Sequence, residues 1–383
     1  MKRIVALALI FLFLVTAVFA EEESDWKFSI AGLRVLWFGI TPTGVDVSFT
    51  YSGIELVENL NTYAFFKLGG GYEERVFYHA IDGSILDDTT VITDPYEYKR
   101  RMINGQWEAA LYQGLTWNER TGDNLLESFL YYRGRYDNYN YSAPAYGTTV
   151  PYLFSSDFTD RNGLFGNSLM LGVCLKDLTE DSHQVQKGIY GEISAEYGPS
   201  WLGNGIFGDT DYWRLNFQVK GFLPLFDLDE ESEKNSLSVY IGDFFSVDYS
   251  GGSSVPVYVV QSFGGKKLRK GLGGSLRGFD KYAWDTRFKA VNNLELRVNG
   301  PAIVHPKLIP ILFTYFDAGY FTGYQTAPGT FDDASGFLCS AGAGIAINAF
   351  GIEHVRMSFD FPLYGQRHDR ENWFLDLDFG LHF

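Results

Sequence analysis

The 383-residue chain has few cysteines, little positive charge and no long apolar segment beyond its first twenty residues. It contains 31 lysine and arginine residues against 47 aspartate and glutamate residues, which gives a formal net charge of −16. Because nucleic-acid binding requires a basic face, this balance argues against a nucleic-acid partner. A membrane-spanning helix needs about 20 apolar residues. Such helices are therefore not expected after residue 20.

The N-terminus carries the pattern of a secretory signal. Two basic residues open the chain, an apolar stretch covers residues 4–17, and the small residue Ala20 precedes the acidic sequence EEES. This order predicts a signal peptide over residues 1–20 with cleavage after Ala20. No cysteine follows the cleavage site, so a lipid anchor is not expected. Because no linker, low-complexity tract or short repeat interrupts the rest, we predict one domain over residues 21–383.

Aromatic residues, by contrast, are abundant at 17% of the chain, with 33 Phe, 25 Tyr and 8 Trp. Outer-membrane barrels place girdles of such rings at both membrane interfaces. Apolar and polar residues also alternate along the chain. In DTDYWRLNFQVKGF, Leu215 and Phe217 lie on one face while Arg214 and Asn216 lie on the other. A period of two indicates β-strands.

A soluble β-sandwich would show the same alternation, so periodicity alone does not decide the fold. The export signal, the aromatic content and strands near the 9–11 residues of a tilted membrane strand favour a barrel. We therefore predict an all-β fold, a transmembrane antiparallel β-barrel of about 16 strands in the bacterial outer membrane. Fourteen strands result if the glycines at 69–71 lie inside one long strand. The expected strands include residues 61–69, 72–79, 254–263 and 373–383.

The two cysteines, Cys174 and Cys339, would suggest a disulfide in an exported protein. Alternation places Cys174 on the face opposite Leu171, whereas Cys339 shares a face with the apolar Phe337 and Ile345. One thiol then faces the lumen and the other faces lipid. We expect both thiols to be free.

The last ten residues, FLDLDFGLHF, give a strong local pattern. Alternate positions from Leu375 to Phe383 are apolar and share one face. A final strand that ends on phenylalanine resembles the β-signal by which outer-membrane barrels are recognised for insertion. We predict that this signal comprises Phe379, Leu381 and Phe383 within a strand over residues 373–383.

Residues 273–279 read GGSLRGF, with one arginine among small residues. This stretch resembles the [VIL]-R-G-[FY] loop motif of the BamA/TamA superfamily, the bacterial surface antigen family of outer-membrane insertases and translocators. In that family the loop follows the eleventh strand, folds back into the barrel and precedes five further strands. Five strand-like runs follow the motif here. The resemblance implies an inserted loop built on Gly274, Leu276, Arg277, Gly278 and Phe279.

Two further stretches resemble the family's twelfth and thirteenth strands. VNNLELRVNGP places the inward acid of the twelfth strand on Glu295, and LFTYFDAGYF places that of the thirteenth on Asp317. Alternation agrees for Glu295, because its neighbours Leu294 and Leu296 take the other face. We expect the planar guanidinium of Arg277 to fork toward both acids. The alternative is that Arg277 is an exposed loop charge.

The resemblance implies a protein that assists insertion or translocation of outer-membrane proteins. In the family, a client strand pairs with the exposed edge of a lateral seam between the first and last strands, which is β-augmentation. Typical members carry periplasmic POTRA modules before the barrel, and this sequence leaves no room for one. We therefore expect a barrel-only member whose partners are membrane lipid, client barrel proteins and a separate periplasmic accessory protein.

Two other classes of function are compatible with an outer-membrane barrel. A passive pore or a structural membrane protein needs only a charged lumen. This function therefore remains the alternative. An enzyme is not expected, because GGSLRG carries Arg277 where a G-x-S-x-G elbow needs glycine. His354, Ser358 and Asp360 share one strand face, but a polar lumen network explains them better than a catalytic triad. The sequence has no metal-binding or phosphate-loop motif, so no metal or cofactor is expected.

Overall fold

The computed structural model describes most of the chain after residue 25. The secretory signal predicted for residues 1–20 lies outside the described residues. The described ranges are 26–36, 41–54, 56–77, 98–140, 163–180, 185–228, 237–279, 284–303, 308–327, 330–331, 333–349, 353–365, 373–379 and 381–383.

One antiparallel sheet of fifteen strands contains nearly all of the described structure. Fourteen strands pair with their neighbours in chain order, and the two-residue β14 (Thr330–Phe331) pairs antiparallel with the end of β13. The first seven are β1 (Trp26–Leu36), β2 (Thr41–Ile54), β3 (Thr62–Phe77), β4 (Tyr98–Asn118), β5 (Asp123–Asn140), β6 (Gly163–Glu180) and β7 (Gln186–Gly198). The other seven are β8 (Asp211–Leu228), β9 (Leu237–Ser254), β12 (Thr286–Asn299), β13 (Pro310–Ala327), β15 (Ser335–Ala349), β16 (Glu353–Tyr364) and β17 (Phe374–Phe379).

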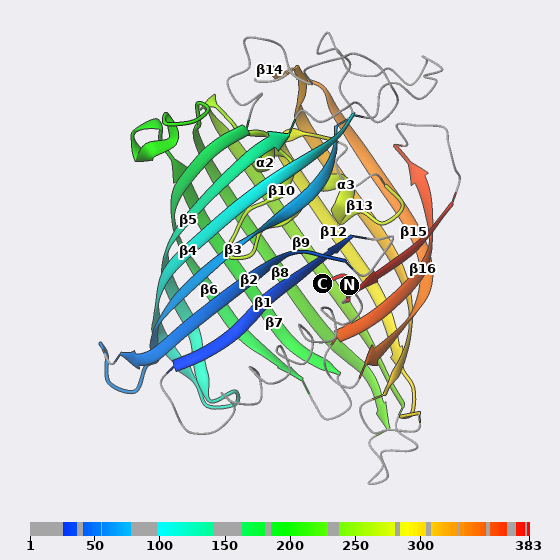
Figure 1. Ribbon diagram of the computed structural model, residues 1–383. Coiled ribbons are helices and arrows are strands. Elements are labelled where there is room, and N and C mark those ends of the chain that lie inside the picture. Colours follow the sequence, from blue (N-terminus) through cyan, green and yellow to red (C-terminus); the bar gives the residue numbers. More distant parts are fainter. Residues whose placement is uncertain are drawn as a thin grey trace.

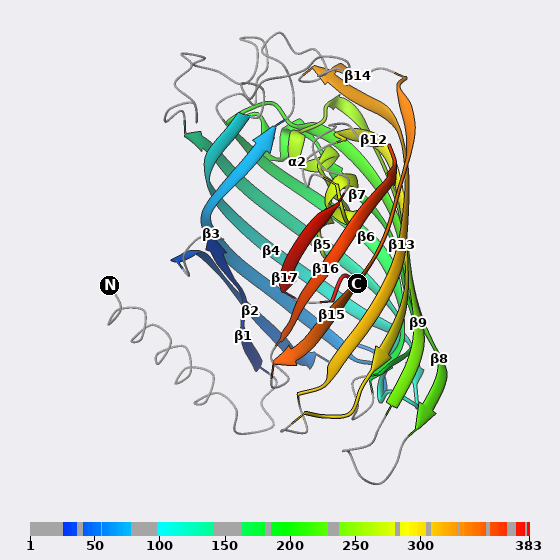
Figure 2. The same ribbon diagram turned by 90° about the vertical axis from the view of Figure 1, so that its right-hand side faces the viewer.

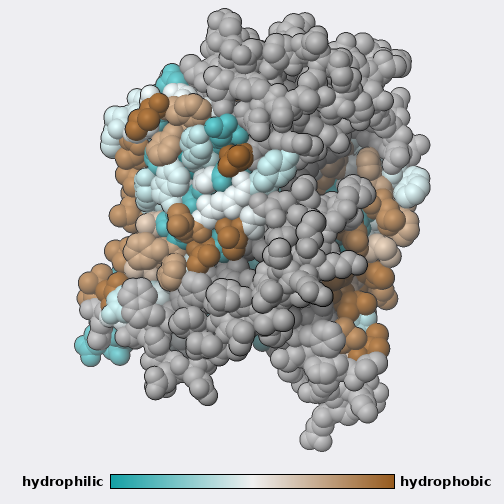
Figure 3. Space-filling view, in the orientation of Figure 1, coloured by the Kyte–Doolittle hydropathy of each residue, from teal (hydrophilic) through white to brown (hydrophobic). Residues whose placement is uncertain are grey.

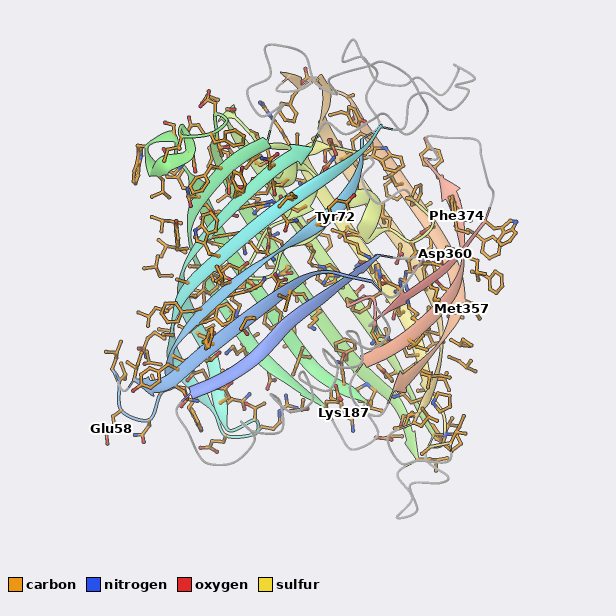
Figure 4. The ribbon with its side chains drawn as sticks, viewed as in Figure 1. Glu58, Tyr72, Lys187, Met357, Asp360 and Phe374 are labelled. Carbon is orange, nitrogen blue, oxygen red and sulfur yellow. The ribbon has the colours of Figure 1, made fainter. Side chains whose placement is uncertain are left out.

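The sheet curves into a barrel, and a segment between β9 and β12 lies inside it (Figures 1 and 2). Alternate connections lie at opposite ends. The turn that contains Glu58 and the start of β7 at Lys187 lie at the same end (Figure 4). We call this the turn end, because the β4–β5 and β6–β7 connections there are short. The segment between β9 and β12 enters from the opposite end.

The exposure pattern is the reverse of that in a soluble protein. Leu171, Ile193 and Leu215 are 63%, 60% and 52% exposed on the outer wall, whereas Arg214 and Arg297 are 1% and 0% exposed inside. Apolar side chains gather on the outer flanks (Figure 3). Lipid accepts apolar side chains and a lumen accepts charged ones. The chain is therefore a transmembrane antiparallel β-barrel, and the sandwich alternative is excluded.

The structure differs from the expected strands at two places before the arginine motif. Residues 61–69 and 72–79 belong to the single strand β3, which runs through the glycines at 69–71. Residues 254–263 do not form a wall strand. Within the described residues nine wall strands therefore precede the arginine motif, not eleven, and the five strands β12, β13, β15, β16 and β17 follow it in the wall.

Other expectations concern helices and cysteines. None of the helices in the described ranges is long and apolar enough to cross a membrane. Cys174 and Cys339 are both free, as expected. Cys174 faces the lumen at 1% exposure, whereas Cys339 stands on the outer face beside the exposed Phe337.

Candidate functional site

The inserted segment, residues 255–279, crosses the lumen as a series of very short elements. It contains helix α2 (Val257–Val260), a two-stranded hairpin of β10 (Ser262–Phe263) and β11 (Arg269–Lys270), and helix α3 (Leu272–Ser275). Strands β9 and β12, which flank the segment, pair directly in the wall. The whole segment is therefore an excursion into the lumen that leaves the sheet continuous.

Two acids on the wall face the end of this segment. In the β12–β13 register, Glu295 pairs with Tyr315 and Asn293 pairs with Asp317. Asp317 is thus the diagonal neighbour of Glu295 on the same face of the sheet. Both carboxylates are buried, while Leu294 and Phe316 stand outside. The register brings two negative charges together inside the barrel.

Arg277 lies between these two carboxylates. Its Nε and Nη2 donate to the two oxygens of Asp317 at 2.8 and 2.6 Å, and its backbone N–H donates to Asp317 at 3.0 Å. Its Nη1 donates to Glu295. The guanidinium also lies 3.5 Å above the ring of Tyr315. We call Arg277, Glu295 and Asp317 the arginine lock. Each guanidinium nitrogen of Arg277 therefore donates to a carboxylate, and the guanidinium carbon lies over an aromatic ring.

Arg297 balances the charge of the lock. Arg297 donates to the other oxygen of Glu295 at 2.6 Å, so two guanidiniums alternate with two carboxylates. Burial lowers the pKa of Arg277, but Asp317 and Glu295 outweigh burial and hold that pKa above its ordinary value. Arg277 is 4% exposed and Asp317 0%. Removing one member of such a buried set leaves an unpaired charge and costs about 3–5 kcal/mol.

The other motif residues pack around the lock. Leu276 is buried against the wall at Gly319, where an added Cβ would stand 2.7 Å from the Leu276 side chain. Gly278 adopts a φ of +83°, which favours glycine. Phe279 meets Trp284 edge to face with 5.4 Å between ring centroids. Gly274 lines a lumen cavity. The motif therefore supplies one charged anchor, one apolar anchor and the turn between them.

A second ionic group, which the sequence analysis did not identify, holds the hairpin of the inserted segment. Glu196 accepts hydrogen bonds from Arg214 and from Ser168, at 3.0 and 2.6 Å. Arg133 donates to the backbone carbonyls of Gly265 and Lys266 at 2.9 and 3.0 Å. The sequence signal that could have identified this group is the series of charged residues on the inner strand faces. Alternation places these residues inside the barrel but does not predict which of them pair across strands.

The hairpin approaches the wall very closely. Backbone N–H groups of Gly264 and Lys266 donate to Asp248 and Glu192 at 2.9 and 2.7 Å. An added Cβ at Gly264 would stand 2.8 Å from Arg214, and one at Gly265, where φ is +99°, would stand 2.8 Å from Glu192. Glycine is required at both positions because the wall side chains occupy the space that a Cβ needs.

The C-terminal residues differ from the expected strand. Strand β17 ends at Phe379, whose side chain lies outside the described residues. Leu375 and Leu377 face outward as expected, at 55% and 40% exposure. Leu381 and Phe383 do not continue this face. They lie in the lumen, so the β-signal expected for Phe379, Leu381 and Phe383 is not one continuous outward stripe.

The lumen offers these residues a better environment than the end of a strand. The ring of Phe383 stacks between Phe222 and Phe244, with centroids 6.0 and 5.9 Å away. Arg269 donates to the His382 carbonyl at 3.2 Å, and the His382 ring lies 3.0 Å from the Ser275 carbonyl. Leu381 packs against an inner-face cluster of β13. The C-terminal residues therefore contact the inserted segment directly.

The expectations for metal ligands and for His354, Ser358 and Asp360 can be compared with the described residues. Within the described ranges, no three His, Cys, Asp or Glu side chains form a group suited to a metal ion. Asp360 of β16 points inward and accepts a hydrogen bond from Tyr315 at 2.5 Å, while Met357 on the same strand lies outside (Figure 4). The side chain of His354 lies outside the described residues. Asp360 thus belongs to the polar network beside the lock.

Solved structures of outer-membrane proteins are similar to this chain. BamA from Haemophilus ducreyi lacking POTRA domains 1–3 is 14% identical with a TM-score of 0.51, and the match covers 88% of this chain and 62% of that one. CdiB from Escherichia coli is 12% identical with a TM-score of 0.46, over 93% and 62%. The chain thus spans about three fifths of the length of these proteins.

No protein-family model matches the sequence, and no curated protein matches it. At 14% identity the likeness to BamA concerns the fold. The chain has a BamA-like barrel fold with an inserted segment fastened by the arginine lock.

Proposed function

We propose that this protein is an integral outer-membrane barrel of the BamA/TamA superfamily that assists the insertion or translocation of other outer-membrane proteins. The observation that carries the proposal is the arginine lock, in which Arg277 contacts Glu295 and Asp317 inside a BamA-like barrel. The lock fixes a segment of 25 residues, 255–279, in the lumen. A fixed internal segment supports one wall of the barrel while another part of the wall opens.

The proposed point of opening is the seam between β1 and β17. Among the described residues no register pairs link these two strands, and β17 has only six residues. An unpaired strand edge presents a row of backbone N–H and C=O groups. A client strand adds to such an edge through backbone hydrogen bonds, with little dependence on its sequence. Pairing through the backbone would allow the proposed seam to accept many different barrel strands.

The proposed partners follow from this mechanism. Membrane lipid surrounds the exposed apolar wall, and client barrel proteins supply the strand that pairs at the seam. A separate periplasmic protein is proposed to recruit the clients. Neither an enzymatic step nor a cofactor is part of the proposal.

A passive pore is the second candidate, because buried charged residues such as Arg133 and Lys289 line the lumen. One experiment separates the two. The protein is depleted in its host and replaced by the wild type, by Arg277→Ala or by Arg120→Ala. Arg120 forms an ion pair with Asp177 at 2.6 Å, but half of its side chain is exposed, so it serves as the matched control.

The proposal predicts that outer-membrane barrel proteins fall in abundance after depletion and with Arg277→Ala, and recover with the wild type and Arg120→Ala. Quantitative proteomics of outer-membrane fractions measures this. Unchanged barrel abundance combined with altered single-channel conductance of Arg277→Ala would support the pore. Hydrolysis of lipid or peptide by the purified protein would contradict both candidates and support an enzyme.

A further inference from the structure

A cavity of about 640 Å³ lies in the lumen between the hairpin of the inserted segment and the C-terminal residues. Leu178 and Tyr190, near the β6–β7 turn, form part of its lining. The cavity therefore extends toward the turn end of the barrel. It is separate from the arginine lock, whose three members do not line it.

Five cationic side chains line this cavity, against two carboxylates. Two of the cations have acidic partners: Lys266 lies 3.7 Å from Glu127, and Lys270 lies 3.2 Å from Asp378. The other three are Lys220, Lys267 and Arg269. In the part of the chain that the structure describes, no carboxylate forms an ion pair with any of these three.

The carboxylates that line the cavity are already engaged. Glu192 accepts hydrogen bonds from Tyr190, Gln218 and the backbone of Lys266, at 2.6, 3.0 and 2.7 Å. Asp378 faces Lys270 and Arg356. Neither acid is placed to compensate the three unpaired cations, so positive charge is left over in the cavity.

Among the described residues, fully buried cations such as Arg214 and Lys289 have a carboxylate beside them, Glu196 for Arg214 and Asp248 at 3.2 Å for Lys289. At Lys220, in contrast, the neighbouring charges are Arg269, Arg297 and Lys267, which are all positive. Burial lowers the pKa of Arg269 to about 10. Like charges held together in a partly buried space favour the uptake of an anion.

We propose that this cavity binds a phosphate-bearing ligand, with Lys220, Lys267 and Arg269 as the donors. Three cations match a phosphate monoester, which carries a charge of about −1.5 to −2 and three acceptor oxygens. Leu178, Leu268 and Leu381 line the same cavity and would accept an apolar group attached to the phosphate. The phosphate belongs either to a small soluble compound or to the headgroup of a phospholipid.

Calorimetric titration of the purified full chain in a maltoside detergent tests the proposal. Inorganic pyrophosphate is the soluble probe, and a short-chain phosphatidic acid is the lipid probe. The variants are Lys220→Gln, Lys267→Gln and the double variant, because within the described residues neither lysine forms a hydrogen bond or ion pair that folding needs. Lys187→Gln is the control, since Lys187 lies at the same end of the barrel but pairs with Asp227 at 3.1 Å.

We expect at least one probe to bind the wild type and Lys187→Gln equally, with affinity at least tenfold lower in the double variant. Binding of pyrophosphate identifies a soluble source, and binding of the phosphatidic acid alone identifies a headgroup. Gel mobility before and after heating verifies that each variant is folded. Failure of both probes to bind the folded wild type, or equal binding by the folded double variant, would overturn the proposal.

Discussion

At the scale of single residues, the lock depends on chemistry that only arginine supplies. Arg277 uses three side-chain nitrogens to contact Asp317 and Glu295, and it lays the plane of its guanidinium on Tyr315. A lysine carries the same charge but cannot form two parallel hydrogen bonds with one carboxylate. The residue type therefore follows from the geometry of its partners.

Replacing Arg277 should destabilise the barrel, and the alanine variant should lose more stability than the lysine variant. Arg277→Ala leaves two carboxylates buried without their cation, so we expect the free energy of unfolding to fall by about 3–5 kcal/mol. Arg277→Lys keeps the charge and loses the fork, so its loss should lie between those of the wild type and the alanine variant. Urea unfolding of protein folded into lipid vesicles measures both. A loss no larger than that of Arg120→Ala would contradict the buried lock.

Attachment of the C-terminal residues should depend on pH through His382. Burial, together with Arg277, Arg356 and Arg269, holds the pKa of His382 well below its usual value. The released residue regains a pKa of about 6.5 and so binds more protons than the docked one. Docking is therefore fully stable above about pH 6.5 and is lost progressively as the pH falls below that value.

Hydrogen exchange of the peptide 374–383, corrected for the intrinsic effect of pH, measures this docking. Its protection should fall several-fold between pH 7 and pH 5 in the wild type. His382→Gln should remove most of this pH dependence. Protection that rises on acidification would contradict the assignment of a neutral, buried imidazole.

At the scale of elements, alternation predicted the walls and failed inside the lumen. Strand β8 follows its pattern of apolar and polar residues, and the resemblance identified Glu295 and Asp317 from strand-like stretches alone. Residues 254–263 were expected to form a wall strand. Helix α2 instead buries these residues in the lumen. A short apolar run does not distinguish a buried helix from a strand.

The C-terminal residues show a second limit of pattern reasoning. FLDLDFGLHF alternates to its end, yet Phe383 stacks on Phe222 and Phe244 instead of facing outward. Those two rings come from β8 and β9, more than a hundred residues earlier in the chain. Contacts between segments so distant in sequence leave no periodic signal. For the same reason, alternation could place Arg133 and Glu196 inside the barrel but could not predict that they pair with each other.

Close approach of the hairpin to the wall gives an element-scale prediction. Gly265→Ala adds a Cβ at positive φ and 2.8 Å from Glu192, so we expect a cost of about 1–3 kcal/mol. The matched control is Gly205→Ala, where φ is −83° and an added Cβ meets nothing within 4 Å. Trypsin cleavage after Lys266 and Lys267 should quicken in the first variant. Equal cleavage in both variants would argue against a tightly seated hairpin.

At the scale of the whole molecule, the barrel is a polar interior inside an apolar wall, and much of that interior is occupied. The inserted segment and the C-terminal residues meet inside it, where Arg269 reaches the His382 carbonyl and Arg297 lies over the ring of Phe383 at 4.9 Å. An edge strand of six residues, β17, connects this interior packing to the proposed seam. The β17 end of the sheet is therefore connected to the contents of the lumen.

Removing the inserted segment should open the lumen to ions. Replacing residues 257–279 with a short glycine–serine linker exchanges buried side chains for water, so single-channel conductance in a planar bilayer should rise several-fold. The same linker in place of the rim turn η2 (Ser200–Asn204) is the control and should leave conductance unchanged. An unchanged conductance after the first replacement would mean that the segment does not occupy the lumen.

Arg277 and Asp317 hold the inserted segment in place as one energetic unit. A double-mutant cycle of Arg277→Ala, Asp317→Ala and the combined variant, followed by urea unfolding in vesicles, measures their coupling directly. We predict a coupling free energy of about 2–3 kcal/mol, because each single variant leaves the other charge buried and unpaired. Additive losses, with a coupling near zero, would contradict the lock and with it the proposed role of the segment.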